Sequence, residues 1–154
     1  MVWILLFYAL AGYITLCTIV FISQRKFLYF PNEIQVSEEL AIDEGLRYWP
    51  SFGNFQGFIS QGKTVDSKGT MIVFHGNAGA AYHHGFYAKA LSIRNLRVIL
   101  AEYPGYGGWA GQLSEDVLVK DALETIRFAY QEYGPPLFVW GESLGGGVVS
   151  SAAR

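Results

Sequence analysis

The chain has 154 residues, a formal net charge of −2 at pH 7, 51% hydrophobic residues and 16% charged residues. This length suits one compact domain at most, and the low charged fraction excludes a disordered chain. Nucleic-acid binding needs clustered Lys and Arg, whereas the longest basic run is Arg25-Lys26, so we expect no nucleic-acid partner. The apolar excess suggests that part of the chain faces lipid.

The first 24 residues carry no charged side chain and are mostly aliphatic and aromatic. At about 1.5 Å per residue, twenty helical residues span the roughly 30 Å hydrocarbon core of a bilayer. A cleavable signal peptide is the rival interpretation, but it needs a basic start and a small-residue cleavage site, which this segment lacks. We therefore expect residues 1–24 to be a retained, single-pass transmembrane anchor. Arg25-Lys26 directly after it places the rest of the chain in the cytoplasm by the positive-inside rule.

Residues 25–44 have the composition of a linker with a docking segment. Pro31 and Asn32 end any helix that continues from the anchor. Four acidic residues between positions 38 and 44 then indicate a solvated face.

Residues 45–154 alternate between short apolar runs and helix-like stretches, with no internal repeat. Ser114 is a candidate N-cap for a long helix, because Glu115 and Asp116 follow it in the first turn. Uniformly apolar strands that alternate with helices predict an α/β fold, a mostly parallel sheet with helices on both faces. The predicted strands are 46–49, 55–59, 71–74, 97–103 and 137–140, and the predicted helices are about 82–93 and the one after Ser114.

A GxSxG pentapeptide, Gly141-Glu142-Ser143-Leu144-Gly145, follows the last apolar run. A Ser on a tight strand-to-helix turn needs small neighbours, because strand and helix crowd together there, and the turn lifts the hydroxyl above the sheet edge. Gly141 and Gly145 meet that need. The alternatives are an incidental Ser in a Gly-rich turn or a phosphate-binding loop, but neither GK[ST] nor GxGxxG is present here.

A second Gly-containing loop, His75-Gly76-Asn77-Ala78-Gly79, follows the first strongly apolar strand. Acyl transfer needs preorganised N–H groups that stabilise an oxyanion, and such a loop can face the N–H after the nucleophile. On this logic the donors are Asn77 and Leu144. His75 precedes the nucleophile and so suits bracing of this loop, with Gly76, better than the role of general base. His83 and His84 are adjacent, point to different sides of a helix and are expected at the surface, so we expect no metal site.

Together these motifs resemble the α/β-hydrolases, and within them the Bem46-like, membrane-anchored serine hydrolases. The resemblance runs from about Gln24 to Arg154 and rests on QRKFLYFPNE, HGNAG, EYPGYG and GESLGGG. It implies that Ser143 is the nucleophile, that Asn77 and Leu144 form the oxyanion hole, and that the loop 103–107 shapes the pocket. Glu102 and Pro104 depart from the family pattern, where Asp and Arg are commoner.

This fold takes its triad acid and His from strands after the nucleophile. Only 11 residues follow Ser143, so we expect a domain truncated after the nucleophile elbow, with the triad Asp and His beyond this chain. Glu142, Glu102 and Asp116 are the carboxylates that could substitute, and Glu142 is expected to be solvated.

Two functions of different class stay open. The first is a membrane-anchored serine hydrolase of carboxylic esters or thioesters, acting on a small-molecule or lipid acyl ester. The second is a catalytically inactive fragment or membrane-bound interaction module. No metal or organic cofactor is implied, and the sequence does not indicate an oligomeric state.

Overall fold

The computed structural model describes residues 1–51, 53–62 and 67–153, so Phe52, residues 63–66 and Arg154 of the predicted 45–154 domain lie outside the described residues. The chain divides into two units, Met1–Phe30 and Pro31–Arg154.

The first unit is dominated by helix α1 (Val2–Leu28). Its 27 residues make it long and apolar enough to cross a membrane, and none of them is buried in the protein. Arg25 and Lys26 lie in the last turn, where cations interact favourably with the negative end of the helix dipole. The helix thus continues four residues past the predicted anchor and ends just before Pro31. Within the described residues, one helix has the length and composition of a membrane span.

The second unit contains a five-stranded sheet in the order β2-β3-β6-β4-β7. The predicted mostly parallel sheet is confirmed only for β6, β4 and β7, because β2 pairs with β3, and β3 with β6, in antiparallel fashion. The sheet is therefore mixed. Its strands are β2 (Leu46–Ser51), β3 (Asn54–Ser60), β4 (Thr70–Phe74), β6 (Arg97–Ala101) and β7 (Leu137–Gly141).

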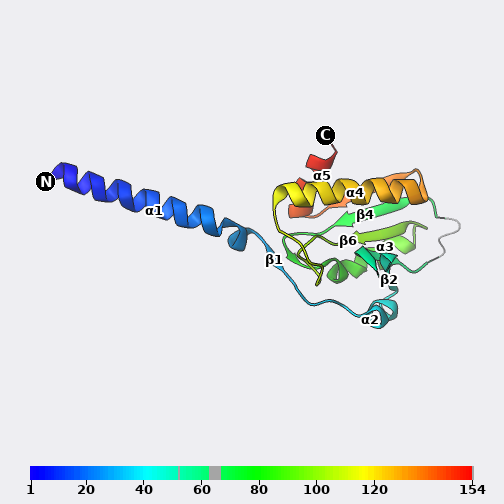
Figure 1. Cartoon of the computed structure of the whole chain (residues 1–154). Coiled ribbons are helices and arrows are strands. Elements are labelled where there is room, and N and C mark those ends of the chain that lie inside the picture. The colour runs from blue at the N-terminus through cyan, green and yellow to red at the C-terminus, as the bar shows by residue number, and fades with distance from the viewer. Residues whose placement is uncertain (52, 63–66, 154) are drawn as a thin grey trace. The chain divides into compact units, whose positions relative to one another are not determined.

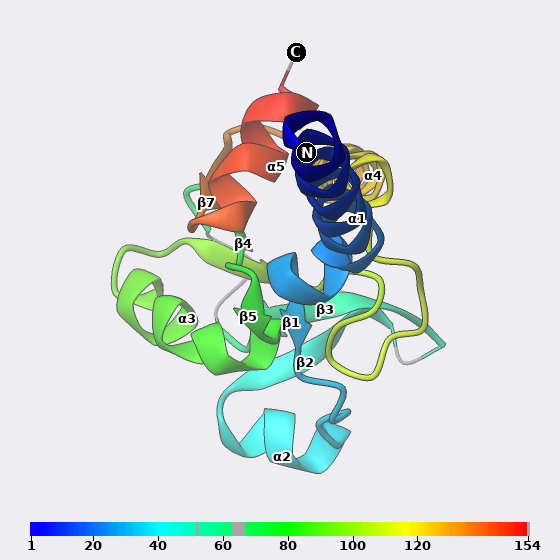
Figure 2. The same ribbon diagram turned by 90° about the vertical axis from the view of Figure 1, so that its left-hand side faces the viewer.

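The helices lie on both faces of the sheet, as predicted (Figures 1 and 2). Helix α3 (Gly85–Ser92) covers one face, and helices α4 (Glu115–Tyr133) and α5 (Leu144–Ala152) cover the other. Ser114 caps α4 by accepting a hydrogen bond from the Val117 N–H, at 3.4 Å. The predicted helix from Tyr82 begins instead as a 3₁₀ turn, η1 (Ala81–His84), a common way to start a helix.

The stretch predicted to be a linker with a docking segment contains a short helix. Helix α2 (Glu38–Asp43) is capped by the Ser37 hydroxyl, which accepts from the Leu40 N–H at 3.3 Å. Its acidic residues face solvent as expected, but Ala41 is fully buried against the core. The remaining short strands are β1 (Phe30–Pro31), at the boundary of the two units, and β5 (Ala78–Gly79).

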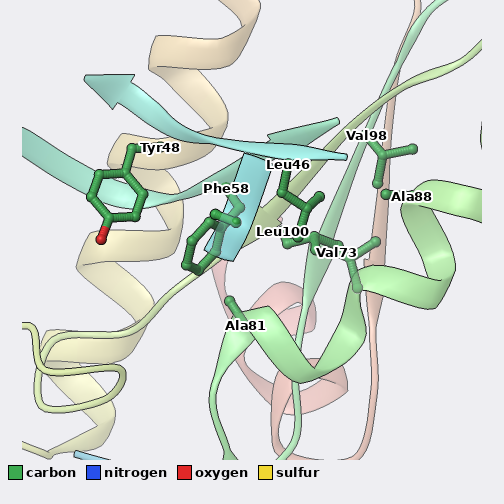
Figure 3. Close-up of a cluster of buried hydrophobic side chains, with 9 residues drawn as sticks. Leu46, Tyr48, Phe58, Val73, Ala81, Ala88, Val98 and Leu100 are labelled. Atoms are coloured by element: carbon green, nitrogen blue, oxygen red, sulfur yellow. The ribbon is translucent and has the colours of Figure 1, made fainter. Parts of the chain in front are cut away.

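One apolar cluster fills the space between the sheet and η1–α3 (Figure 3). Ala81 and Ala88 present small side chains to Val73, Val98 and Leu100 from the central strands. Small residues on a helix allow a close approach to the branched side chains of the sheet. Because alternate residues of a strand point to opposite faces, Ile72 and Ile99 face the α4 side and are fully buried there.

The buried face of α4 carries two polar residues among the apolar ones. Leu118, Ala122 and Ala129 are fully buried as the spacing predicts, but Asp121 and Thr125 are buried with them. Within the described part of the chain, neither Asp121 Oδ2 nor Thr125 Oγ1 has a hydrogen-bond partner. Burial, and to a lesser extent the charge of Glu124, raises the pKa of Asp121 to about 7.

This burial makes stability depend on pH. An unfolded Asp titrates near 3.8, so between about pH 4 and 7 the folded state binds a proton that the unfolded state has lost, and stability falls as the pH rises through this window. We expect Asp121→Asn to abolish this slope and to raise the unfolding free energy at pH 8 by on the order of 2 kcal/mol. Urea unfolding at pH 5 and at pH 8 measures the unfolding free energy at each pH and so gives its pH dependence. Asp116→Asn, on the exposed first turn of α4, should keep the wild-type slope.

Candidate active site at the carboxyl edge of the sheet

Strand β4 lies between two parallel neighbours whose ends are level with its own. Phe74 pairs with Ala101 of β6 on one side and with Gly141 of β7 on the other. From β4 the chain passes to α3 on one face, whereas from β7 it passes to α5 on the opposite face. Adjacent strands that exit to opposite faces leave a crevice at their carboxyl ends, where ligands bind in open α/β sheets. The candidate site therefore lies beyond Phe74 and Gly141.

Ser143 stands in this crevice at the turn from β7 into α5. Its backbone has φ 51° and ψ −111°, a conformation that L-residues with a Cβ adopt at a cost of about 1–3 kcal/mol. The side chain is exposed. A strained, exposed Ser between strand and helix is the geometry expected of a nucleophile elbow.

Glycines permit this turn by close backbone contact. A Cβ on Gly145 would overlap the carbonyl oxygen of Phe74, and a Cβ on Gly141 would overlap the carbonyl oxygen of Gly145. Both collisions involve backbone atoms, which cannot rotate away. Strand and helix therefore cross within a distance that only glycine allows at both positions.

The loop after β4 lies against the elbow. A Cβ built on Gly76 would be 3.6 Å from the Ser143 Cβ, so the two loops are in van der Waals proximity. Asn77 follows Gly76, and its carbonyl oxygen accepts a hydrogen bond from the Tyr106 hydroxyl at 3.0 Å. Leu144 is the first residue of α5, and the first N–H groups of a helix have no intrahelical acceptor. Both predicted oxyanion donors thus belong to segments beside Ser143.

His75 is buried and holds the loop rather than facing the crevice. Its Nε2 lies 2.8 Å from Glu102 Oε1, and its Nδ1 lies 2.8 Å from the Gly76 carbonyl oxygen. The ring is thus held between the Glu102 carboxylate and the backbone of the loop. The bracing role of His75 stays a prediction, and these two contacts are its structural basis.

Glu102 has a structural role that the sequence did not indicate. It is fully buried, and its Oε2 accepts from the Ala81 N–H at 3.0 Å. Gly107, at φ 57°, packs so closely that a Cβ there would overlap the carboxylate. Glu102 thereby joins the loop after β4, the start of η1 and the loop after β6, and it is not available as a substitute triad acid. No local sequence signal indicates this pairing, because it depends on the register of β4 against β6.

Two tyrosines of the loop after β6 complete the support. The Tyr103 hydroxyl donates to the His75 carbonyl oxygen at 3.0 Å, and the Tyr106 hydroxyl donates to that of Asn77. Both rings are fully buried and lie 4.5 and 5.1 Å from the His75 ring. Burial raises the pKa of Tyr103 far above its usual range, so the hydroxyl stays a donor. These residues fix the backbone of the loop that carries Asn77.

Glu142 and His84 form a second, more exposed group beside the elbow. Glu142 Oε2 accepts from the Tyr87 hydroxyl at 3.3 Å and lies 3.6 Å from His84 Nε2. Glu142 is partly solvated, as predicted, whereas the surface position expected for His84 is wrong, because its side chain is only 13% exposed. Burial is the main reason that the pKa of His84 lies below its usual range. His83 is exposed, as expected.

Asp116, the third carboxylate considered as a substitute, is exposed in the first turn of α4 and is no part of this network. Across residues 1–51, 53–62 and 67–153, no group of three or more His, Cys, Asp or Glu side chains could hold a metal ion.

Several curated proteins are similar to this chain. The lysophosphatidylserine lipase ABHD12 of Danio rerio is 36% identical over 96 residues, which cover 60% of this chain and 25% of the relative. The human protein ABHD12B is 33% identical over 128 residues, covering 75% of this chain and 35% of the relative. The lysophosphatidylserine lipase ABHD12 of Xenopus tropicalis is 34% identical over 87 residues, covering 54% of this chain and 22% of the relative.

The aligned parts thus span between about a fifth and a third of the length of these relatives. No family model matches the chain.

Removing the carboxylate at Glu102 tests the buried network. We expect Glu102→Ala to lower the unfolding free energy by roughly 3 kcal/mol, because it removes the partner of the buried His75 Nε2 and of the Ala81 N–H. Glu102→Gln keeps an acceptor and should cost less. Denaturant unfolding measures both effects. Glu124→Ala breaks the exposed Lys120–Glu124 pair on α4 and should cost less than about 1 kcal/mol. Equal effects of the Glu102 and Glu124 alanine variants would contradict the assignment.

Proposed function

Because the homologues of this chain are the ABHD12 and ABHD12B proteins, α/β-hydrolase domain-containing proteins of the Bem46-like family, we propose that it is a serine hydrolase of lipid esters with Ser143 as nucleophile. The observation that carries the proposal is the strained, exposed Ser143 at the strand-to-helix turn, with Gly76 of the neighbouring loop against it. Two of the relatives are lysophosphatidylserine lipases, which suggests the substrate class.

In the proposed reaction, Ser143 Oγ attacks the acyl carbonyl carbon and gives its proton to a His base. The N–H groups of Asn77 and Leu144 hold the resulting oxyanion. The tetrahedral intermediate then collapses, and the alcohol leaves with the proton from the His. Water then attacks the acyl carbon of the acyl-enzyme and gives its proton to the His. The second tetrahedral intermediate collapses to the carboxylic acid, and Ser143 Oγ leaves with the proton from the His. We propose that the triad acid and His lie beyond residue 154, because this fold supplies them after the nucleophile in the order Ser, acid, His.

The support for this assignment is physical as well as comparative. The N-terminus of α5 places partial positive charge beside Ser143, where negative charge would develop. The buried His75–Glu102 pair and the two tyrosine hydroxyls hold the Asn77 loop rigid, and preorganised donors stabilise an oxyanion without reorganisation during the reaction.

We further propose that residues 1–24 are a retained anchor, residues 25–44 a linker and docking segment, and residues 45–154 the N-terminal part of the hydrolase domain. A tethered enzyme meets lipid substrates at a raised local concentration, which suits a lipid ester. The basic residues Arg25 and Lys26 after the apolar stretch favour a cytoplasmic catalytic side.

The nucleophile is tested in the full-length gene product. We expect Ser143→Ala to abolish labelling by a fluorophosphonate and to lower turnover of a lysophospholipid by on the order of 10⁶, the loss typical when a triad member is removed. Ser150→Ala, about two turns further along α5, should leave both unchanged. Labelling that persists in Ser143→Ala would identify a different nucleophile. A wild-type protein that never labels would favour the inactive interaction module.

The anchor is tested separately. We expect the protein to pellet with membranes and to resist alkaline carbonate extraction, because releasing about twenty apolar residues into water is unfavourable. Deletion of residues 2–24 should release it. A reporter fused after residue 154 should lie on the cytoplasmic side. Recovery of the wild type in the soluble fraction would remove the anchor, whereas a reporter on the outer side would reverse only the orientation.

A further inference from the structure

The segment 31–36, which we call the strap, runs from the boundary of the two units to helix α2 and joins the two loops of the candidate site. The Asn32 N–H donates to the carbonyl oxygen of Gly79 at 2.8 Å, and the Asn32 carbonyl oxygen accepts from the Gly107 N–H at 2.7 Å. Gly79 ends the loop that carries Asn77, and Gly107 belongs to the loop that carries Tyr103 and Tyr106. The backbone of one residue thus connects both loops.

The conformation of Asn32 is set by its own side chain. Asn32 Oδ1 accepts from the Ile34 N–H at 2.9 Å, the contact of an Asx turn, which mimics a backbone turn and fixes the direction of the chain. Asn32 is half-buried, whereas its neighbours Glu33 and Ile34 are exposed. The side chain that shapes the strap is therefore Asn32.

A packing contact and a hydrogen bond hold the rest of the strap in place. Gly108 has φ 77°, and a Cβ built on it would be 2.7 Å from the Gln35 Cβ and 3.1 Å from its Cα, so the loop after β6 packs directly on the strap backbone. The Val36 carbonyl oxygen accepts a hydrogen bond from the Tyr48 hydroxyl of β2. The strap is thus attached to the rigid sheet at one end and to both loops at Asn32.

These contacts act on the Asn77 loop at the end opposite to its buried support. The loop is held at His75 by Glu102 and Tyr103, and at Asn77 by Tyr106, whereas Gly79 is held by Asn32. An oxyanion donor is effective only when it stays within about 0.5 Å of its working position. A loop released at Gly79, two residues after Asn77, would no longer meet that condition.

We propose that the strap, through Asn32, is a positioning element of the catalytic site that holds Asn77 in place as an oxyanion donor. The proposal rests on the proposed function for its catalytic consequence. It gives the linker segment a role that is independent of membrane attachment. Loss of a whole oxyanion donor costs about 10²–10³ in kcat, so a loosened donor should cost roughly tenfold.

The test compares Asn32→Ala with Asn32→Asp in the full-length protein. Alanine removes the acceptor for the Ile34 N–H, whereas aspartate keeps one. We expect Asn32→Ala to lower kcat for a p-nitrophenyl ester roughly tenfold with KM unchanged, and to speed hydrogen exchange of residues 75–79 and of Gly107. Asn32→Asp should have the kcat and the hydrogen exchange of the wild type. Glu33→Gln, at the exposed neighbouring position, should behave as wild type.

Either an unchanged kcat or unchanged exchange in Asn32→Ala would overturn the proposal, as would an effect confined to KM. Should Asn32→Ala not fold, Gly108→Ala displaces the strap from the other side, because the new Cβ would collide with Gln35, and the same readouts apply. If the wild type itself neither labels nor hydrolyses the ester, the proposed function fails. The exchange of residues 75–79 in the two Asn32 variants then still decides whether the strap holds the loop.

Discussion

The arrangement of the candidate site depends on the register of β4 between its two parallel neighbours. Phe74 is level with Ala101 on one side and with Gly141 on the other. The next residues of the three strands, His75, Glu102 and Glu142, therefore leave the sheet side by side. A shift of one residue would turn His75 away from Glu102 and bring the wrong residues to the elbow, because successive side chains of a strand point to opposite faces.

From this register follow two different environments on either side of the loop after β4. Toward β6 the space is closed, and the fully buried His75 and Glu102 lie 2.8 Å apart. Both ring nitrogens of His75 and both carboxylate oxygens of Glu102 have partners there. Toward β7 the space is open, and Ser143 and Glu142 are exposed. Buried polar groups need satisfied hydrogen bonds, so the closed side can supply rigidity while the open side can admit a ligand.

The strain at Ser143 is consistent with this division. A non-glycine residue at φ 51° persists only where the surroundings over-determine it, and here β7, α5 and the end of β4 do so through contacts that exclude any Cβ at Gly141 and Gly145. The strap adds a restraint from outside the sheet. Asn32 contacts both loops through its backbone N–H and carbonyl groups, and its side chain fixes the direction of the chain there.

The sequence by itself determined the elements and the local geometry of the elbow. Apolar runs located all five strands of the sheet, Ser114 located the start of α4, and the glycines around Ser143 indicated a crowded turn, because these features depend on neighbours close in the chain. It did not determine the mixed character of the sheet, since β2 and β3 carry no local sign of antiparallel pairing. The sequence also did not predict that the first turn after Ala80 is a 3₁₀ turn or that the His84 side chain is largely buried.

Only the tertiary structure decided which distant residues meet. Glu102 looked like a departure from a family pattern and proved to be the partner of His75, 27 positions away, because strand register is a property of the assembled sheet. The acidic residues around Glu38 indicated a solvated face, and the structure shows that Ala41 between them packs into the core. Asn32 was predicted to end a helix, and the structure shows that it also joins two loops. Long-range pairing arises from burial and register in three dimensions, and one-dimensional patterns do not encode either of them directly.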